Sequence, residues 1–146
     1  MDRSACSACS RIAAIADGKN PDFVATLAET HVLLADEQAY RGYCLLFLKD
    51  HHEALDELPL DRQARVWEDV ARVAGVLRKT CNPARLNYAC LGNFVTHVHW
   101  HVIPRYADDP EKLHPIWVRP VDERVKALPA ADRQQLLADL RRALAR

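Results

Sequence analysis

The sequence predicts an α+β fold in which a mainly antiparallel, five-stranded sheet carries one long helix on one face. Three observations lead to this prediction. A continuous apolar run at residues 43–48 lies between turn-forming residues, as is typical of a buried strand. Residues 61–80 repeat apolar side chains with helical spacing. Two further strand-like segments, residues 86–91 and 95–103, are separated by a Gly-Asn pair, which favours a hairpin.

The elements that precede the apolar run are short. Residues 6–17 contain a Cys-x-x-Cys pair followed by a brief apolar stretch, and residues 18–21 (GKNP) form a turn by composition. Residues 23–27 and 31–35 are expected to be short strands. Together with the apolar run and the two later segments, they make five strands.

The long helix is expected to begin at an N-terminal cap provided by Asp61, because an Asp side chain accepts hydrogen bonds from the first free amides of a helix. Four prolines make residues 104–120 mostly loop, and residues 132–145 are expected to form a short amphipathic helix. The apolar stripe of the long helix consists of Trp67, Val70, Ala74 and Leu77.

Length and charge limit the classes of function. A chain of 146 residues predicts one domain spanning residues 1–146, with a helical extension at residues 132–146. Its 20 basic and 20 acidic side chains cancel, which argues against generic binding to nucleic acids or membrane surfaces. The chain also lacks an apolar run long enough to span a membrane and an apolar signal-peptide core. We therefore expect a cytoplasmic protein. The five cysteines are an odd number in a chain without a secretory signal, which argues against a disulfide framework.

The most informative segment is HVHWHVIP at residues 97–104. Side chains of a strand alternate between its two faces, so His97, His99 and His101 are expected to share one face. Three buried imidazoles would each need hydrogen-bond partners, which makes a purely structural role costly. At an open face two alternatives remain: a metal platform, since His-x-His pairs on strands hold zinc, or an imidazole nucleophile whose neighbours neutralise an anion.

The segment HVHWHVI resembles the signature of the histidine triad (HIT) family of nucleotide-binding hydrolases and transferases, in which three histidines alternate with apolar residues. The N-terminal CSACSRIAAIADGKNP resembles the zinc-containing bacterial members of this family. LLADEQAYRGYCLLFLKDHHEAL and LNYACLGNFVTH resemble the segments that precede the triad, in the expected order. The likeness covers about residues 6–117 and implies the family's five-stranded α+β fold.

The resemblance implies a role for two of the histidines. The middle histidine of the triad, here His99, would attack the α-phosphorus of a nucleotide and carry the nucleotidyl group covalently, which divides one difficult displacement into two easier ones. His101 would contact the phosphate oxygens and the leaving group as a hydrogen-bond donor or general acid. Within the family, this chemistry requires no divalent metal at the phosphorus.

Four other residues are implied to bind the substrate. Asp36 would accept hydrogen bonds from the ribose, Asn87 and Asn93 would donate to the phosphate or the leaving group, and Trp117 would lie near the substrate, often across a dimer interface. Each residue also has a simpler interpretation, as a turn or strand-end polar residue or as a packed aromatic side chain. Phe94 lies where many relatives have Ser or Thr, so it offers no hydroxyl to the leaving group.

Cys6 and Cys9 have the spacing of metal ligands. A redox pair would instead be expected at the start of a helix that follows a strand. The resemblance supplies two more zinc ligands, His51 and His97, and these would complete a closed, structural site. His52 is the adjacent alternative to His51.

Two classes of function follow from these observations. The favoured one is an enzyme that hydrolyses or transfers the nucleotidyl group of a nucleoside phosphate, such as a dinucleoside polyphosphate or an adenosine phosphoramidate. The alternative is a nucleotide-binding or zinc-stabilised interaction module with little turnover. The intact triad favours the enzyme. Because family members commonly pair two sheets, we also expect a homodimer.

Overall fold

The computed structural model describes residues 6–145 and contains one five-stranded antiparallel sheet with the strand order β1-β2-β3-β5-β4. The predicted α+β fold with five strands and a long helix is confirmed. The strands are β1 (Phe23–Thr26), β2 (Thr30–Leu34), β3 (Cys44–Leu48), β4 (Arg85–Cys90) and β5 (His99–Arg105). The helices are α1 (Ser7–Ala16), α2 (Leu60–Cys81), α3 (Val121–Arg124) and α4 (Ala130–Leu144), with short 3₁₀ turns η2 (Leu55–Glu57) and η3 (Ile116–Val118).

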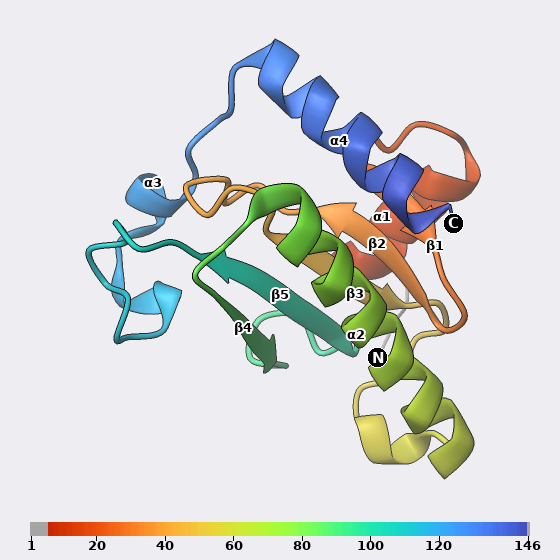
Figure 1. Ribbon diagram of the computed structural model, residues 1–146. Helices are drawn as coiled ribbons and strands as arrows, with labels where there is room; N and C mark the ends of the chain where they lie inside the picture. Colours follow the sequence, from red (N-terminus) through yellow and green to blue (C-terminus); the bar gives the residue numbers. More distant parts are fainter. Residues whose placement is uncertain (1–5, 146) are drawn as a thin grey trace.

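Helices α2 and α4 lie on the same face of the sheet, where they bury the main hydrophobic core (Figure 1). Strand residues such as Val32 and Val102 pack there against Val70 of α2 and Leu140 of α4. Successive strand residues point to opposite faces, so Leu33 turns to the other side and packs near the start of α1. The sheet therefore has one face covered by two helices and another that is only partly covered by α1. We call the second one the histidine face, because His99 and His101 of β5 lie on it.

The start of α2 differs from the predicted cap at Asp61. The helix begins at Leu60, with Pro59 in the N-cap position. A proline has no amide hydrogen to leave unpaired at a helix start. The Asp61 carboxylate instead pairs with Arg65, at 2.8 Å from its Nη1 atom.

The prediction that Trp67 belongs to the buried stripe of α2 is wrong. Trp67 is 51% exposed, whereas Val66, Val70 and Leu77 are buried. The helix is rotated so that its buried stripe runs through Val66, and Trp67 lies at the border, with its ring centroid 4.6 Å from that of Trp100. The remaining predicted stripe residues are buried.

A buried carboxylate joins α2 to the β1–β2 hairpin. Asp69 accepts hydrogen bonds from the backbone amides of Ala28, Glu29 and Thr30 and from the Thr30 hydroxyl, at 2.8–3.1 Å. Because hydrogen bonds to an ionised acceptor are stronger than neutral ones, Asp69 holds the turn of this hairpin against the helix. No local pattern around residue 69 predicts this long-range contact.

The connection between β4 and β5 is longer than the predicted hairpin turn. Cys90 pairs with Trp100, and β5 begins at His99 rather than at residue 95. Residues 91–98 form a loop in which Phe94 is fully exposed. Just before β5, the Val98 amide donates to the His52 carbonyl, so this part of the chain is bonded to the segment after β3 instead of to β4.

Helices α1 and α4 lie near the two ends of the described chain. The helix α1 was not expected from the short apolar stretch after the cysteine pair. The predicted C-terminal helix is confirmed as α4, and the predicted loop region before it contains η3 and the single turn α3. Within residues 6–145, no helix has both the length and the apolar content needed to cross a membrane.

Candidate functional site

The strand β5 places His99 and His101 on the histidine face, while Trp100 and Val102 point toward α2. The ring centroids of the two histidines lie 4.8 Å apart. His97 precedes β5 and is completely buried, but its ring lies on the same side of the sheet, because the Phe47 ring contacts both His97 and His99. This agrees with the alternation that the sequence predicted. The three histidines of the motif therefore lie on one side of the sheet, two of them within β5 and one just before it.

The orientation of His99 is set by the backbone. Its Nδ1 atom lies 2.8 Å from the His97 carbonyl oxygen, which only accepts hydrogen bonds, so Nδ1 carries the proton. The Nε2 atom of the neutral ring then has a free lone pair. His99 lines a cavity of about 590 Å³ on the histidine face. In its neutral form, an imidazole held in this way has a ring nitrogen that can act as a nucleophile.

His101 is held by a residue that the sequence did not single out. The Tyr43 hydroxyl lies 2.5 Å from the His101 Nδ1 atom. Burial raises the pKa of Tyr43, so its hydroxyl remains protonated and donates to this nitrogen. Burial, with a smaller contribution from His99, lowers the pKa of His101 to about 4. The neutral ring therefore carries its proton on Nε2, as a donor.

The lowered pKa of His101 predicts a loss of stability in acid. In the unfolded chain His101 binds a proton with its ordinary pKa of 6.5, whereas in the folded chain its pKa is about 4. The unfolded state therefore binds more protons across this interval, and stability falls as the pH decreases. We expect a loss of about 2 kcal/mol between about pH 7 and about pH 5 from this group.

Denaturant unfolding at the two pH values, with chelator present in every sample, measures this loss. The His101→Gln variant lacks the titrating ring, so its stability should fall less than that of the wild type over the same interval. Tyr43, His99 and Trp117 contact the ring of His101 and are retained in both proteins. Equal pH slopes for the two proteins would contradict the assignment.

The cavity beside His99 has an apolar floor. Leu45 and Phe47 of β3 line it, together with Asn93 and Phe94 from the loop before β5. Arg11 from α1 enters it and lies over the Phe47 ring, 5.9 Å from the ring centroid. This combination of an apolar floor and a few polar groups is typical of small-molecule sites.

The structure places the four predicted substrate contacts at different distances from this cavity. Asn93 lines it, whereas Asp36 lies outside it with an exposed carboxylate that is 3.9 Å from Arg11. Asn87 lines a second, neighbouring cavity, and Trp117 lines both cavities. The ring centroid of Trp117 is 5.3 Å from that of His101 in the same chain, so this contact needs no second protomer.

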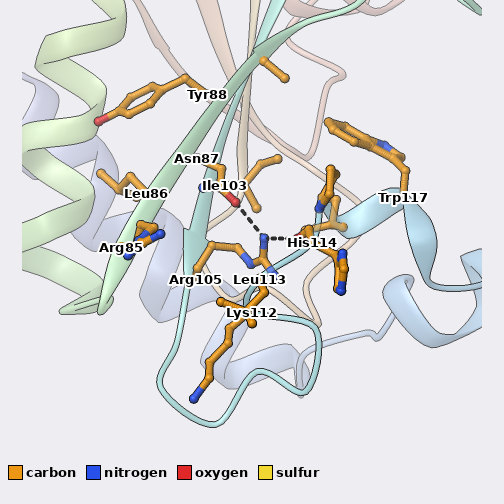
Figure 2. A pocket seen from close by; sticks show the side chains of 13 residues that line it. Arg85, Leu86, Asn87, Tyr88, Ile103, Arg105, Lys112, Leu113, His114 and Trp117 are labelled. Carbon is orange, nitrogen blue, oxygen red and sulfur yellow. Dashed lines mark hydrogen bonds between the residues drawn. The ribbon is translucent and has the colours of Figure 1, made fainter.

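A buried arginine holds Asn87 and the segment that carries Trp117. Arg105 donates to the Asn87 Oδ1 atom at 2.6 Å and to the His114 carbonyl (Figure 2). It also donates to the Glu111 carbonyl. Its charge is compensated by Asp109, at 2.5 Å. An arginine that binds several acceptors from one rigid fork fixes their relative positions. Sequence analysis missed Arg105, because its partners lie in separate segments.

Cys6, Cys9, His51 and His97 meet at one point, with their ligand atoms all within 4.8 Å of one another. The Cys9 Sγ atom lies 3.3 Å from Nδ1 of His51 and 3.5 Å from Nδ1 of His97, and the Cys6 Sγ atom lies 3.8 Å from the latter. Tetrahedral zinc, with bonds of about 2.3 Å to sulfur and about 2.0 Å to nitrogen, separates such atoms by about 3.5 Å. The cluster is compatible with zinc.

The protonation of His97 also fits a metal ligand. Its Nε2 atom donates to the Leu48 carbonyl at 2.8 Å, which leaves the lone pair of Nδ1 directed at the two thiols. Of the two adjacent histidines, His51 belongs to the cluster, whereas His52 points to Glu57, at 2.9 Å.

The cysteine pair lies at a helix start after all. Cys6 immediately precedes α1, and Cys9 lies in its first turn. The redox arrangement considered from the sequence requires a preceding strand, but α1 comes before β1. The two imidazoles beside the thiols therefore favour a metal site over a redox pair.

The five-stranded sheet, the two histidines on β5 and the cluster of two cysteines and two histidines are the arrangement that the resemblance to the HIT family implied. Residues 18–108 match the HIT domain family, which is more than half of the chain, so the protein belongs to this family. Membership supports a function of the nucleotide-binding or nucleotide-hydrolysing type.

Individual relatives agree with this assignment. An uncharacterised HIT-like protein from Methanocaldococcus jannaschii is 36% identical over 75 residues, which span 49% of this chain and only 58% of that protein. A crystal structure of a histidine triad protein from Bradyrhizobium japonicum is 28% identical, with a TM-score of 0.68 over 84% of this chain and 90% of that one. A zinc-bound histidine triad family protein from Mycobacterium smegmatis is 22% identical and shares the fold, with a TM-score of 0.68 over 98% and 95% of the two chains.

Proposed function

We propose that this protein cleaves a nucleoside phosphate at its α-phosphorus through a covalent nucleotidyl-histidine on His99. The observation that carries the proposal is the hydrogen bond between His99 Nδ1 and the His97 carbonyl, which assigns the lone pair of the neutral ring to Nε2, in a residue that lines a cavity of about 590 Å³. His101 lies beside it as a neutral donor for the phosphate oxygens. The substrate class is a dinucleoside polyphosphate or an adenosine phosphoramidate.

The proposed reaction proceeds in two displacements. The His99 Nε2 lone pair forms a bond to the α-phosphorus, and the bond from phosphorus to the leaving oxygen or nitrogen breaks with its electron pair on the leaving atom. Because the Tyr43 hydroxyl occupies Nδ1 of His101, the Nε2–H of this ring is the group that would give its proton to the leaving atom. Water then attacks the phosphorus and gives a proton to the Nε2 atom of His101. The bond from phosphorus to His99 Nε2 breaks with its electron pair on the nitrogen, which releases a nucleoside monophosphate and restores both histidines.

The cavity beside His99 supplies the proposed contacts to the nucleoside. Leu45 and Phe47 form an apolar surface for a base, and Arg11 lies over it. Asp36 lies next to Arg11, where its carboxylate is available to a ribose hydroxyl at the rim. Asn93 is placed to donate to the phosphate from the loop before β5.

Rapid quench of the wild-type protein with diadenosine tetraphosphate or an adenosine phosphoramidate tests the covalent step. We expect an added mass of one adenosine monophosphate, located on the peptide that contains His99. Tight nucleotide binding without an adduct or any turnover would instead identify a binding module.

We further propose that Cys6, Cys9, His51 and His97 hold one structural zinc ion. The ion would supply no chemistry at the phosphorus and would join the start of α1 to the segment after β3 and to the loop before β5. Two observations support the proposal: the four ligand atoms are clustered, and His97 turns its unprotonated nitrogen toward the thiols. His97 also provides the carbonyl that orients His99, so this site would stabilise the position of the nucleophile.

We also propose that the protein is a homodimer paired through β4. This strand lies at one edge of the sheet, and an unpaired edge is a template for another strand. Beside it, Tyr88 is 42% exposed and Trp67 is 51% exposed. Light scattering at micromolar concentration should give twice the 16.5 kDa mass of one chain. Trp67→Glu should lower this value, whereas a monomer mass for the wild type would contradict the proposal.

A further inference from the structure

The second cavity, of about 470 Å³, lies between strands β4 and β5 and the segment that leads to η3 (Figure 2). Three of the residues that line it, Arg85, Arg105 and Lys112, carry a positive charge, and His114 adds an imidazole. Among the described residues that line the cavity, none is a carboxylate. The charge of this cavity therefore favours an anionic ligand.

Most of the positive charge is not used by the fold. Arg105 is buried and compensated by Asp109. Arg85 and Lys112 are exposed, and neither forms an ion pair within residues 6–145. The Asn87 oxygen accepts from Arg105, so the amide group of Asn87 is left as a further donor in the same cavity. The cavity thus offers hydrogen-bond donors and two positively charged side chains, Arg85 and Lys112, that have no acidic partner among the described residues.

This cavity adjoins the one that contains His99. Trp117 lines both cavities, and its ring contacts His101. Ala89, which lines the second cavity, pairs directly with His101 across the β4–β5 ladder. A ligand whose α-phosphorus lies at His99 and His101 therefore has the cationic cavity next to its scissile bond.

We infer that the second cavity binds the leaving half of the substrate and that this half is a phosphorylated group, such as a nucleoside polyphosphate, rather than a small neutral amine. The inference rests on the proposed function and specifies its substrate class. When the bond from the α-phosphorus to the bridging oxygen breaks, the electron pair stays on that oxygen and the leaving phosphate gains negative charge. Arg85 and Lys112 would stabilise this charge in the product and in the transition state.

Calorimetric titration with inorganic tripolyphosphate tests the subsite without any turnover. We expect the wild type to bind it and the Arg85→Gln/Lys112→Gln variant to bind about tenfold more weakly, since each charge-assisted contact contributes about 1 kcal/mol or less at an exposed position. The matched control is Arg78→Gln/Lys79→Gln, which removes two exposed charges from α2 on the other side of the sheet and should bind as the wild type does. Equal binding by all three proteins, or no binding by the wild type, would overturn the inference.

Kinetics with two substrates that share the adenylyl half complete the test. The double variant should lower kcat/KM for diadenosine tetraphosphate about tenfold and change that for adenosine phosphoramidate by less than about twofold. An equal effect on both substrates would overturn the inference while leaving the proposed function intact. Absence of turnover on either substrate would overturn the proposed function, and the tripolyphosphate titration would still decide the subsite. Thermal melts of the single variants show whether either substitution disturbs the fold.

Discussion

Replacing His99 with Asn should reduce turnover of a nucleoside phosphate by about three orders of magnitude or more, because the substitution removes the attacking nitrogen and with it the covalent route. Asn retains a polar side chain of moderate size on β5, so the sheet should be preserved. Nucleotide affinity should survive, since Arg11, Asn93 and Phe47 line the cavity independently of His99. Steady-state kinetics and equilibrium nucleotide binding, measured on the same preparation, separate the two effects.

A matched control for this variant is His52→Asn. The side chain of His52 bonds to Glu57 and belongs neither to the metal cluster nor to the cavity beside His99. Its removal should leave kcat and the nucleotide adduct unchanged. Wild-type turnover in the His99→Asn protein, or an adduct located on His101, would show that the nucleophile is assigned to the wrong residue.

Loss of the proposed zinc ion should cause the largest change in stability. Cys9 contacts both histidines of the cluster, and Cys6 lies at the start of α1, so a serine at either position removes a ligand that binds this helix to the rest of the fold. Metal binding that is coupled to folding contributes several kcal/mol, and a loss of about 3 kcal/mol would lower the Tm by about 10 °C in a chain of this size.

Elemental analysis and thermal melting check this expectation together. Protein purified without added metal should contain one zinc per chain, and chelation or Cys6→Ser should lower the Tm. Cys90→Ser is the control, because Cys90 is an exposed cysteine on β4 outside the cluster. A wild-type protein without zinc, whose Cys6 and Cys9 thiols react freely, would contradict the assignment.

Much of the fold follows from local patterns in the chain. The apolar run that became β3 and the helical spacing that became α2 are each strong signals, because burial on one side of a regular element imposes a fixed period. The helix α1 has no comparable signal, since it is short and follows directly on the cysteine pair. The start of β5 was misplaced for a different reason: Val98 bonds to the segment after β3, a long-range choice that periodicity does not reveal.

In the candidate site, too, some residues could be identified from local patterns and others only from contacts between distant segments. The motif itself identified His99 and His101, and the family likeness named the four residues that the structure brings together as a metal-compatible cluster. Tyr43 was hidden at the start of an apolar run, where a tyrosine is indistinguishable from core. Arg105 was hidden at the end of β5, because its partners lie at Asn87 and in the segment after the strand.

Alternation along residues 97–101 and helical spacing along residues 61–80 establish the class of fold and the chemistry-bearing residues, since both depend only on neighbours in the chain. Which nitrogen of His99 and of His101 carries the proton depends on the His97 carbonyl and on the Tyr43 hydroxyl. The cationic cavity beside them is likewise formed by distant segments, which Arg105 joins by bonding to Asn87 of β4 and to the His114 carbonyl before η3. These features come from packing between distant segments, where hydrogen-bond donors and acceptors must be paired in three dimensions.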